Sequence, residues 1–302
     1  MEATHIKTIL VPTDFSDKSE RARKLAVQMA LRHNAELIMI HAMGSRFITD
    51  RTGRQVIGAD IVKMNTEKAD KALQNIKKTA LKRHPQLLIR TILKTGMLLD
   101  VLNETIENHD NTIVVMGMSG QQRLKELFLG SYSYEVLVSV KCSVLLVPME
   151  NRKTFFRNIL VPIRNANQSD TKIALTKAIA ERNRSEVTLC GVANEDTLLE
   201  VQHELTTTEP LIANADCKTE LVLTADKAEA ISKISNKENS DLIILSYHDE
   251  AIWKSFFGQN FFKRIINRTS SPLFFIKNQA EVTPLQDTDQ VSGYDLSLPI
   301  PG

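Results

Sequence analysis

The chain has 302 residues, which is enough for one large domain or for two of about 150 residues. The apolar fraction of 42% and the charged fraction of 25% are those of an ordinary globular protein. The 38 basic and 36 acidic residues are mixed along the chain and aromatic residues make up only 5%, so we expect no nucleic-acid partner. No apolar run reaches the roughly 18 residues that span a bilayer, so we expect no membrane partner.

Short apolar runs rich in β-branched residues predict parallel strands that are covered on both faces. In the first half they lie at residues 8–12, 36–43, 87–93, 112–117 and 143–148. The segments between them have helical periodicity. After the first run, one apolar stripe is formed by Ala22, Leu25, Ala26, Met29 and Ala30. Ser16 or Asp17 is placed to cap the start of that helix.

The second half repeats this plan. The segment ILVPTDFSDKSERARKLAVQMA begins at Ile9, and ILVPIRNANQSDTKIALTKAIA begins at Ile159, 150 residues later. Further along, IVVMG from Ile113 matches LIILS from Leu242, only 129 residues later. The second copy has therefore lost about 21 residues, which we place in the loop and helix that follow its second strand.

Alternating strands and helices predict an α/β fold with two tandem doubly wound domains, each with a mostly parallel five-stranded sheet. The repeat places the domains at residues 1–150 and 151–280. The remaining residues, 281–302, contain four acids, no base and three prolines, and predict a disordered tail. In doubly wound sheets, ligands bind beyond the carboxyl ends of the strands. That rule selects the residues just after each run, which are Thr13, Asp14, Ala42, Met43, Gly96 and Gly117 onward.

One glycine-rich segment follows the fourth predicted strand. It reads GMSGQQRLKELFLGS, residues 117–131, and has the spacing G-x2-G-x9-G-S without the lysine of a G-x4-G-K-[ST] loop. Gly117 and Gly120 would let the backbone turn and approach a ligand closely. Gly130 and Ser131 would open the next helix, whose free N–H groups favour an anion. The alternative is that these glycines only form turns.

These motifs together resemble the universal stress proteins. The similar elements are ILVPTD, a second strand ending in I-H-A, and VVMG-x2-G-x9-G-S followed by SVLLVP. The resemblance covers roughly residues 5–278 and implies the universal-stress-protein or adenine nucleotide alpha hydrolase-like fold. The spacing G-x2-G-x9-G-[ST] marks the ATP-binding branch of that family. The resemblance therefore implies ATP as the ligand of the first domain, with Mg²⁺ open as a companion of the triphosphate.

The same resemblance implies the residues of the nucleotide site. Asp14 would meet the ribose or adenine side, and the backbone at Ala42 would contact adenine. The glycine segment and the start of the following helix would hold ribose and phosphates. The full set is Pro12, Thr13, Asp14, Ala42, Met116, Gly117, Gly120, Gly130, Ser131, Tyr132 and Ser133. For Asp14, capping of the following helix is the alternative.

The second copy departs from the motif at positions that the resemblance assigns to nucleotide binding. Asp14 aligns with Arg164, and the two motif glycines 117 and 120 align with Ser246 and Asp249. Added Cβ atoms and negative charge both oppose nucleotide binding. We therefore expect a degenerate, mainly structural second domain that pairs with the first through the last strands, SVLLVP and SPLFFIK. A homodimer stays open as an alternative.

The sequence presents no evident catalytic group or metal-ligand cluster. His41 at the end of a strand is expected to be a satisfied core histidine. The three cysteines form no C-x-x-C pair and are expected to be reduced, buried thiols of a cytoplasmic protein: Cys142, Cys190 and Cys217. The leading hypothesis is an ATP-binding stress-response regulator or binding module. The alternatives are a slow ATPase that uses the same site and a nucleotide-independent scaffold.

Overall fold

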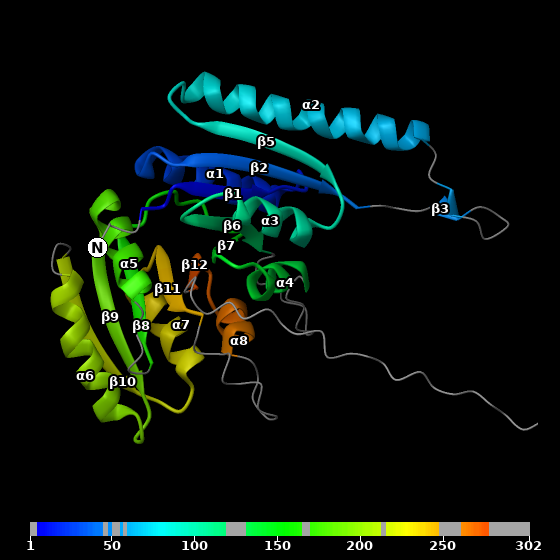
Figure 1. Cartoon of the computed structure of the whole chain (residues 1–302). Coiled ribbons are helices and arrows are strands. Elements are labelled where there is room, and N and C mark those ends of the chain that lie inside the picture. The colour runs from blue at the N-terminus through cyan, green and yellow to red at the C-terminus, as the bar shows by residue number, and fades with distance from the viewer. Residues whose placement is uncertain are drawn as a thin grey trace, which may run out of the picture.

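The computed structural model describes residues 5–44, 48–49, 55–56, 59–118, 131–164, 170–212, 216–247 and 261–277. These residues form one ten-stranded sheet in the order β10-β9-β8-β11-β12-β7-β6-β1-β2-β5, flanked by helices (Figure 1). A two-stranded ribbon, β3 (Ile48–Thr49) and β4 (Gln55–Val56), stands apart from it.

The first copy, residues 5–148, supplies five strands and four helices among the described residues of the main fold. The strands are β1 (Thr8–Pro12), β2 (Glu36–Met43), β5 (Ile89–Thr95), β6 (Thr112–Met118) and β7 (Ser143–Pro148). The helices are α1 (Asp17–His33), α2 (Ala59–Arg83), α3 (Leu98–Glu107) and α4 (Ser131–Ser139). All its strand pairings are parallel.

The second copy, residues 158–277, repeats the same order of elements. Its strands are β8 (Asn158–Ile163), β9 (Glu186–Ala193), β10 (Asp216–Leu223), β11 (Leu242–Ser246) and β12 (Leu273–Ile276). Its helices are α5 (Asp170–Asn183), α6 (Leu198–Thr208), the 3₁₀ helix η1 (Glu209–Ile212), α7 (Lys227–Lys237) and α8 (Phe261–Arg268). The predicted α/β class and doubly wound sheets are confirmed.

The helices cover the sheet in two layers. One hydrophobic cluster joins α1, α2, α5 and α6 to one face, and a second joins α3, α4, α7 and α8 to the other. Ile9 and Val11 of β1 belong to the first cluster and Leu10 to the second, as the alternation of side chains along a strand requires. Because both faces are covered, the strands are continuously apolar, and the burial of β1 and β7 is complete along their lengths.

The predicted apolar stripe on the first helix is confirmed, since all five of its residues are buried in α1. The predicted side-chain cap is not formed. Ser16 occupies the N-cap position, but its side chain makes no capping hydrogen bond. Its hydroxyl and backbone N–H are instead donated to Asp14, two residues earlier. The preceding carboxylate thus orders the entry into α1.

The third strand was predicted two residues too early. The ladder with β2 starts at the pair Leu37 and Ile89, while Leu88 is 58% exposed. The shortening of the second copy affects the expected region, because the 25-residue α2 corresponds to the 11-residue α6 and η1. The long α2 lies along the edge strand β5 (Figure 1).

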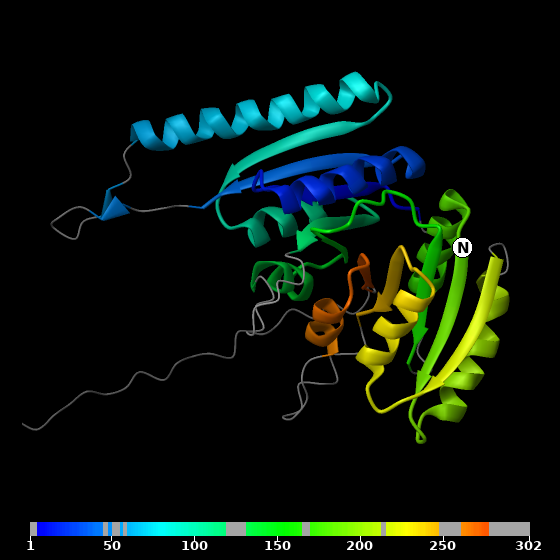
Figure 2. The ribbon, with the colours of Figure 1, turned by 180° about the vertical axis from the view of Figure 1, so that it is seen from behind.

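The two copies meet at the centre of the sheet, seen from both sides in Figures 1 and 2. There β7 and β12 pair antiparallel, with Leu146 opposite Leu273 and Val144 opposite Phe275. Their side chains are fully buried, so each last strand covers the edge of the other.

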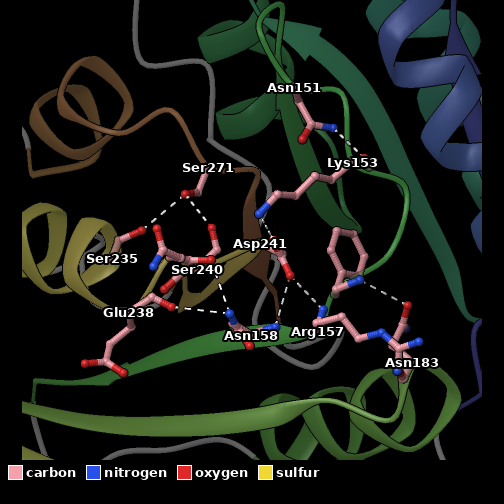
Figure 3. Close-up of polar contacts among 12 residues, drawn as sticks. Asn151, Lys153, Arg157, Asn158, Asn183, Ser235, Glu238, Ser240, Asp241 and Ser271 are labelled. Atoms are coloured by element: carbon pink, nitrogen blue, oxygen red, sulfur yellow. Dashed lines mark hydrogen bonds and ion pairs between the residues drawn. The ribbon is translucent and has the colours of Figure 1, made fainter.

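A polar network secures the connection between β7 and β8 (Figure 3). Asp241, which precedes β11 and is 5% exposed, accepts the backbone N–H groups of Arg157 at 2.8 Å and Asn158 at 3.1 Å. Lys153 Nζ lies 2.5 Å from the same carboxylate. The buried charge is thereby satisfied by three donors.

Two further sequence expectations concern the cysteines and the membrane. Cys142 and Cys190 are free and buried, as predicted, whereas Cys217 is free and half-buried. Burial raises the pKa of Cys142 and of Cys190 to about 12, so both stay protonated thiols near neutral pH. No helix in the described part of the chain is both long and apolar enough to cross a membrane.

Candidate functional site

The predicted site residues gather at the carboxyl ends of β1, β2 and β6. In the first copy the sheet order is β7-β6-β1-β2-β5, so the chain proceeds from β1 to β2 on one side and later returns to β6 on the other. The strand order therefore reverses between β1 and β6. In open parallel sheets this reversal leaves a crevice between the connections that leave the two strands.

Thr13 joins β1 to both neighbouring elements. Its N–H is donated to Ile40 O at 2.8 Å, which extends the ladder between β1 and β2. Its hydroxyl lies 3.2 Å from the Ser19 hydroxyl on α1 and accepts the Phe15 N–H at 3.1 Å. The side chain is 8% exposed, so Thr13 chiefly orders the turn that carries Asp14.

Asp14 is the one predicted site residue with an accessible charged group among the described positions. Its side chain is 53% exposed, and Oδ2 lies 3.6 Å from Lys18 Nζ. Partial burial raises the pKa of this carboxyl, but hydrogen bonds from Ser16 and Ser19 and the charge of Lys18 outweigh it and lower the pKa. The carboxylate is therefore ionised near neutral pH and retains acceptor capacity toward solvent.

Phe15 and His41 complete this corner, and sequence reasoning assigned neither to the site. Phe15 has φ of 62°, the left-handed region that side chains other than glycine rarely adopt. Its ring lies 4.6 Å from the His41 ring. His41 is half-buried rather than in the core, and its Nδ1–H is donated to Thr13 O at 2.7 Å. Sequence periodicity does not reveal this left-handed residue or its contact with His41.

Gly117 ends β6 against the first turn of α1. A Cβ at this position would lie 2.2 Å from Lys18 O and 2.6 Å from Lys18 C, both backbone atoms. The absence of a side chain thus permits close packing of α1 on β6, a role that sequence reasoning did not assign to it. Gly117 O also accepts the hydroxyl of the buried Ser133 at 3.3 Å. This bond ties β6 to α4.

The remaining predicted residues differ in exposure. Pro12 is buried at the end of β1, Ala42 and Met116 are half-buried, and Tyr132 is 46% exposed at the start of α4. Ser131 is the first residue of α4, and its side chain is not among those described. Gly120 and Gly130 lie outside the described residues. The structure therefore brings together the β1, β2 and β6 parts of the predicted set.

Comparison with known proteins identifies the family. The model of the universal stress protein family matches residues 5–148. A protein from Thermus aquaticus named "Universal stress protein in QAH/OAS sulfhydrylase 3'region" is 31% identical over 142 residues, which are 47% of this chain and 98% of the relative. The chain belongs to the universal stress protein family.

Solved universal stress proteins extend the likeness to the second copy. The structure of one from Archaeoglobus fulgidus DSM 4304 matches 92% of this chain and 99% of its own, with a TM-score of 0.71. Its sequence identity is 18%, so this likeness shows the fold over both copies. Another universal stress protein was solved in complex with cAMP; it is 26% identical, covers 47% of this chain and 96% of its own, and has a TM-score of 0.34.

The equivalent corner of the second copy of this universal stress protein is occupied by basic side chains. Arg164, which aligns with Asp14, lies over the Phe261 ring at 3.8 Å from its centroid. Lys172, which stands where the first copy has Ala22, is 2% exposed and donates to Pro162 O at 2.9 Å. Lys227 Nζ donates to Arg164 O at 3.1 Å. Side chains of this chain therefore fill space at the carboxyl end of β8.

The described part of the chain was searched for metal-ligand clusters and for acid–base groups at the site. It contains no group of three or more His, Cys, Asp or Glu side chains that could hold a metal ion. At the carboxyl ends of β1 and β2, His41 and Asp14 are already hydrogen-bonded to Thr13 and Ser16. The described arrangement offers hydrogen-bond acceptors, above all the exposed carboxylate of Asp14.

Proposed function

We propose that this universal stress protein binds one ATP, in its first copy, and acts as a nucleotide-dependent regulator or binding module of a stress response. The observation that supports this most is the convergence of Thr13, Asp14 and Gly117 where the strand order reverses. The corresponding place in the second copy contains Arg164 and the buried Lys172. Only the first copy combines an accessible carboxylate with the complete glycine spacing.

Each part of the proposed site has a chemical task. Asp14 accepts ribose hydroxyls, because one carboxylate can accept two O–H donors. The backbone at Ala42 faces adenine. The segment from Gly117 to Ser131 supplies N–H groups and the start of α4 to the phosphates, with Mg²⁺ on the triphosphate. Further assigned positions are Pro12, Met116, Tyr132 and Ser133.

The nucleotide proposal is tested by mass spectrometry of small molecules released when the purified protein is denatured. We expect ATP or a related adenine nucleotide at about one per chain. The substitution Gly120→Asp places a side chain and a negative charge in the glycine segment, so we expect the bound nucleotide to fall at least tenfold. Release of phosphate from added ATP, measured in the same preparations, separates binding from hydrolysis.

The matched control is Gly258→Asp, the same change in the corresponding segment of the second copy. We expect it to leave the bound nucleotide unchanged. Absence of nucleotide from the wild-type protein, together with no binding at millimolar ATP and Mg²⁺, would contradict the proposal. Equal losses in both variants would contradict the assignment to the first copy.

We also propose that the copies are two domains, divided near residues 150 and 151, that pair within one chain through β7 and β12. The antiparallel ladder and its buried side chains support this arrangement. Light scattering is expected to give a mass near the 34.0 kDa of one chain at micromolar concentration. A stable dimer that Leu145→Lys in β7 dissociates would oppose the proposal. Cytoplasmic location stays a prediction.

A further inference from the structure

A basic pocket lies between α1 and α2, away from the proposed nucleotide site. It has a volume of about 210 Å³ and is bordered by Thr154 of the connection between β7 and β8. Its charged lining consists of Arg23 and Lys24 from α1 and Arg83 from α2, with His84 directly after that helix. We use "basic pocket" for the site lined by these five residues.

Positive charge exceeds negative charge around the basic pocket. On α1, Glu20 is shared between Arg23, at 2.6 Å, and Lys24, at 3.5 Å. On the other side, the end of α2 at residues 71–83 contains five Lys and Arg residues and no Asp or Glu. Among the described residues, Arg83 has no carboxylate partner within ion-pair distance. The pocket is therefore suited to an anionic ligand.

The second copy does not repeat this charge pattern. The positions 150 residues after Arg23 and Lys24 are Ile173 and Ala174. The helix that corresponds to α2 is shortened to α6, which contains Glu200 and Glu204. The fold therefore tolerates uncharged residues at these positions. Packing alone does not explain why the first copy has basic residues there.

The chain itself contains a segment of opposite charge. Residues 281–302 include four acids and no base, in a protein whose net charge is only +2. If fully extended, 25 residues such as those from 278 to 302 would span at most roughly 80–90 Å. Within these last residues the acidic side chains are therefore not offset by any basic one.

The described chain ends within reach of the basic pocket. Lys277 and His5 line one cavity of about 170 Å³. Arg32, near the end of α1, donates to Thr154 O at 2.6 Å. Thr154 borders the basic pocket, and the 25 residues that follow Lys277 are long enough to reach it.

From this complementarity and reach, we infer that residues 281–302 bind in cis over the basic pocket between α1 and α2. Each exposed ion pair contributes little by itself. A tethered segment has an effective concentration in the millimolar range, which makes weak pairing sufficient. The bound tail would lie on α1, whose first turn packs against Gly117 at the other end of the helix.

The test is lysine footprinting of the full chain with an acetylating reagent at low salt. The comparison protein has the tail acids neutralised by Glu281→Gln, Asp287→Asn, Asp289→Asn and Asp295→Asn. We expect Lys24 and Lys82, beside the pocket, to be acetylated at least threefold faster in that variant. Lys63 and Lys68, exposed nearer the start of α2, are the matched controls and should change by less than a factor of 1.5. The difference should disappear at 0.5 M salt.

Carbodiimide cross-linking of a mixture of ¹⁴N- and ¹⁵N-labelled wild-type chains identifies the partner. Tail carboxylates linked to Lys24 or Lys82 within one isotopic chain support the inference. Links between differently labelled chains would overturn it in favour of a second copy. Equal footprints in both proteins would also overturn it, as would protection that depends on added single-stranded RNA rather than on the tail.

Discussion

Replacement of Gly117 by alanine is expected to lower the free energy of unfolding by about 3 kcal/mol. The new Cβ would lie 2.2 Å from Lys18 O, and neither this carbonyl nor β6 can yield without moving the first turn of α1. Overpacking of a well-packed site typically costs about 1–3 kcal/mol. The clashing atoms here belong to the backbone, so they cannot move aside by a change of rotamer. Denaturant unfolding of wild-type and variant protein measures the difference.

Gly44→Ala is the matched control for this prediction. No heavy atom lies within 4 Å of a Cβ built at Gly44, so its unfolding free energy should change by less than about 0.5 kcal/mol. If Gly117→Ala were as stable as Gly44→Ala and lost only nucleotide affinity, the glycine would be needed only to let a ligand approach the backbone. The packing role derived from the structure would then be wrong.

Acidification is expected to destabilise the contact between α1 and α5 through His33. This ring is 5% exposed, and neither nitrogen has a hydrogen-bond partner among the described residues. Burial, together with the positive charges of Arg182 on α5, of the adjacent Arg32 and of His5, lowers the pKa of His33 to about 3. The folded protein therefore favours the neutral ring.

The sign of the pH effect follows from this shift. In the unfolded chain His33 binds a proton near its ordinary pKa of 6.5, whereas the folded chain does not bind one until about pH 3. The stability contribution is fully present above pH 6.5 and is lost as the pH falls. The loss should reach about 2 kcal/mol at pH 5.

His33→Asn tests this prediction, because the second copy has Asn183 at the equivalent position. There Nδ2 donates to Ile179 O at 2.8 Å and Oδ1 accepts the Phe156 N–H at 3.2 Å. We expect the variant to lose about 2 kcal/mol less than the wild type between pH 7.5 and pH 5. His203→Asn on the exposed face of α6 should keep the wild-type pH dependence. Equal pH dependence in all three proteins would show that His33 is not the sensitive group.

The architecture could be predicted because it depends on patterns that repeat along the chain. The 150-residue offset identified two copies, and continuous apolar runs placed the strands within two residues of β1, β2 and β5. The burial of Lys172 could also have been predicted, because the same offset aligns this residue with Ala22 of the predicted apolar stripe.

The details of the site could not be predicted, because they arise from contacts between distant segments. The packing role of Gly117 depends on how closely α1 approaches β6, a distance that no local pattern records. The left-handed Phe15 and its contact with His41 depend on the turn that joins β1 to α1 beside the end of β2. From the glycine spacing alone, a glycine needed for packing, such as Gly117, cannot be told from one needed for ligand approach.

The central claim, one nucleotide site in the first copy, is tested most directly by calorimetric titration of the full chain with ATP and Mg²⁺. We expect a stoichiometry of one ATP per chain in the wild type. We expect no measurable binding in Gly120→Asp and an unchanged stoichiometry in Gly258→Asp. Two equivalent sites per chain, or no binding up to millimolar ATP, would contradict it.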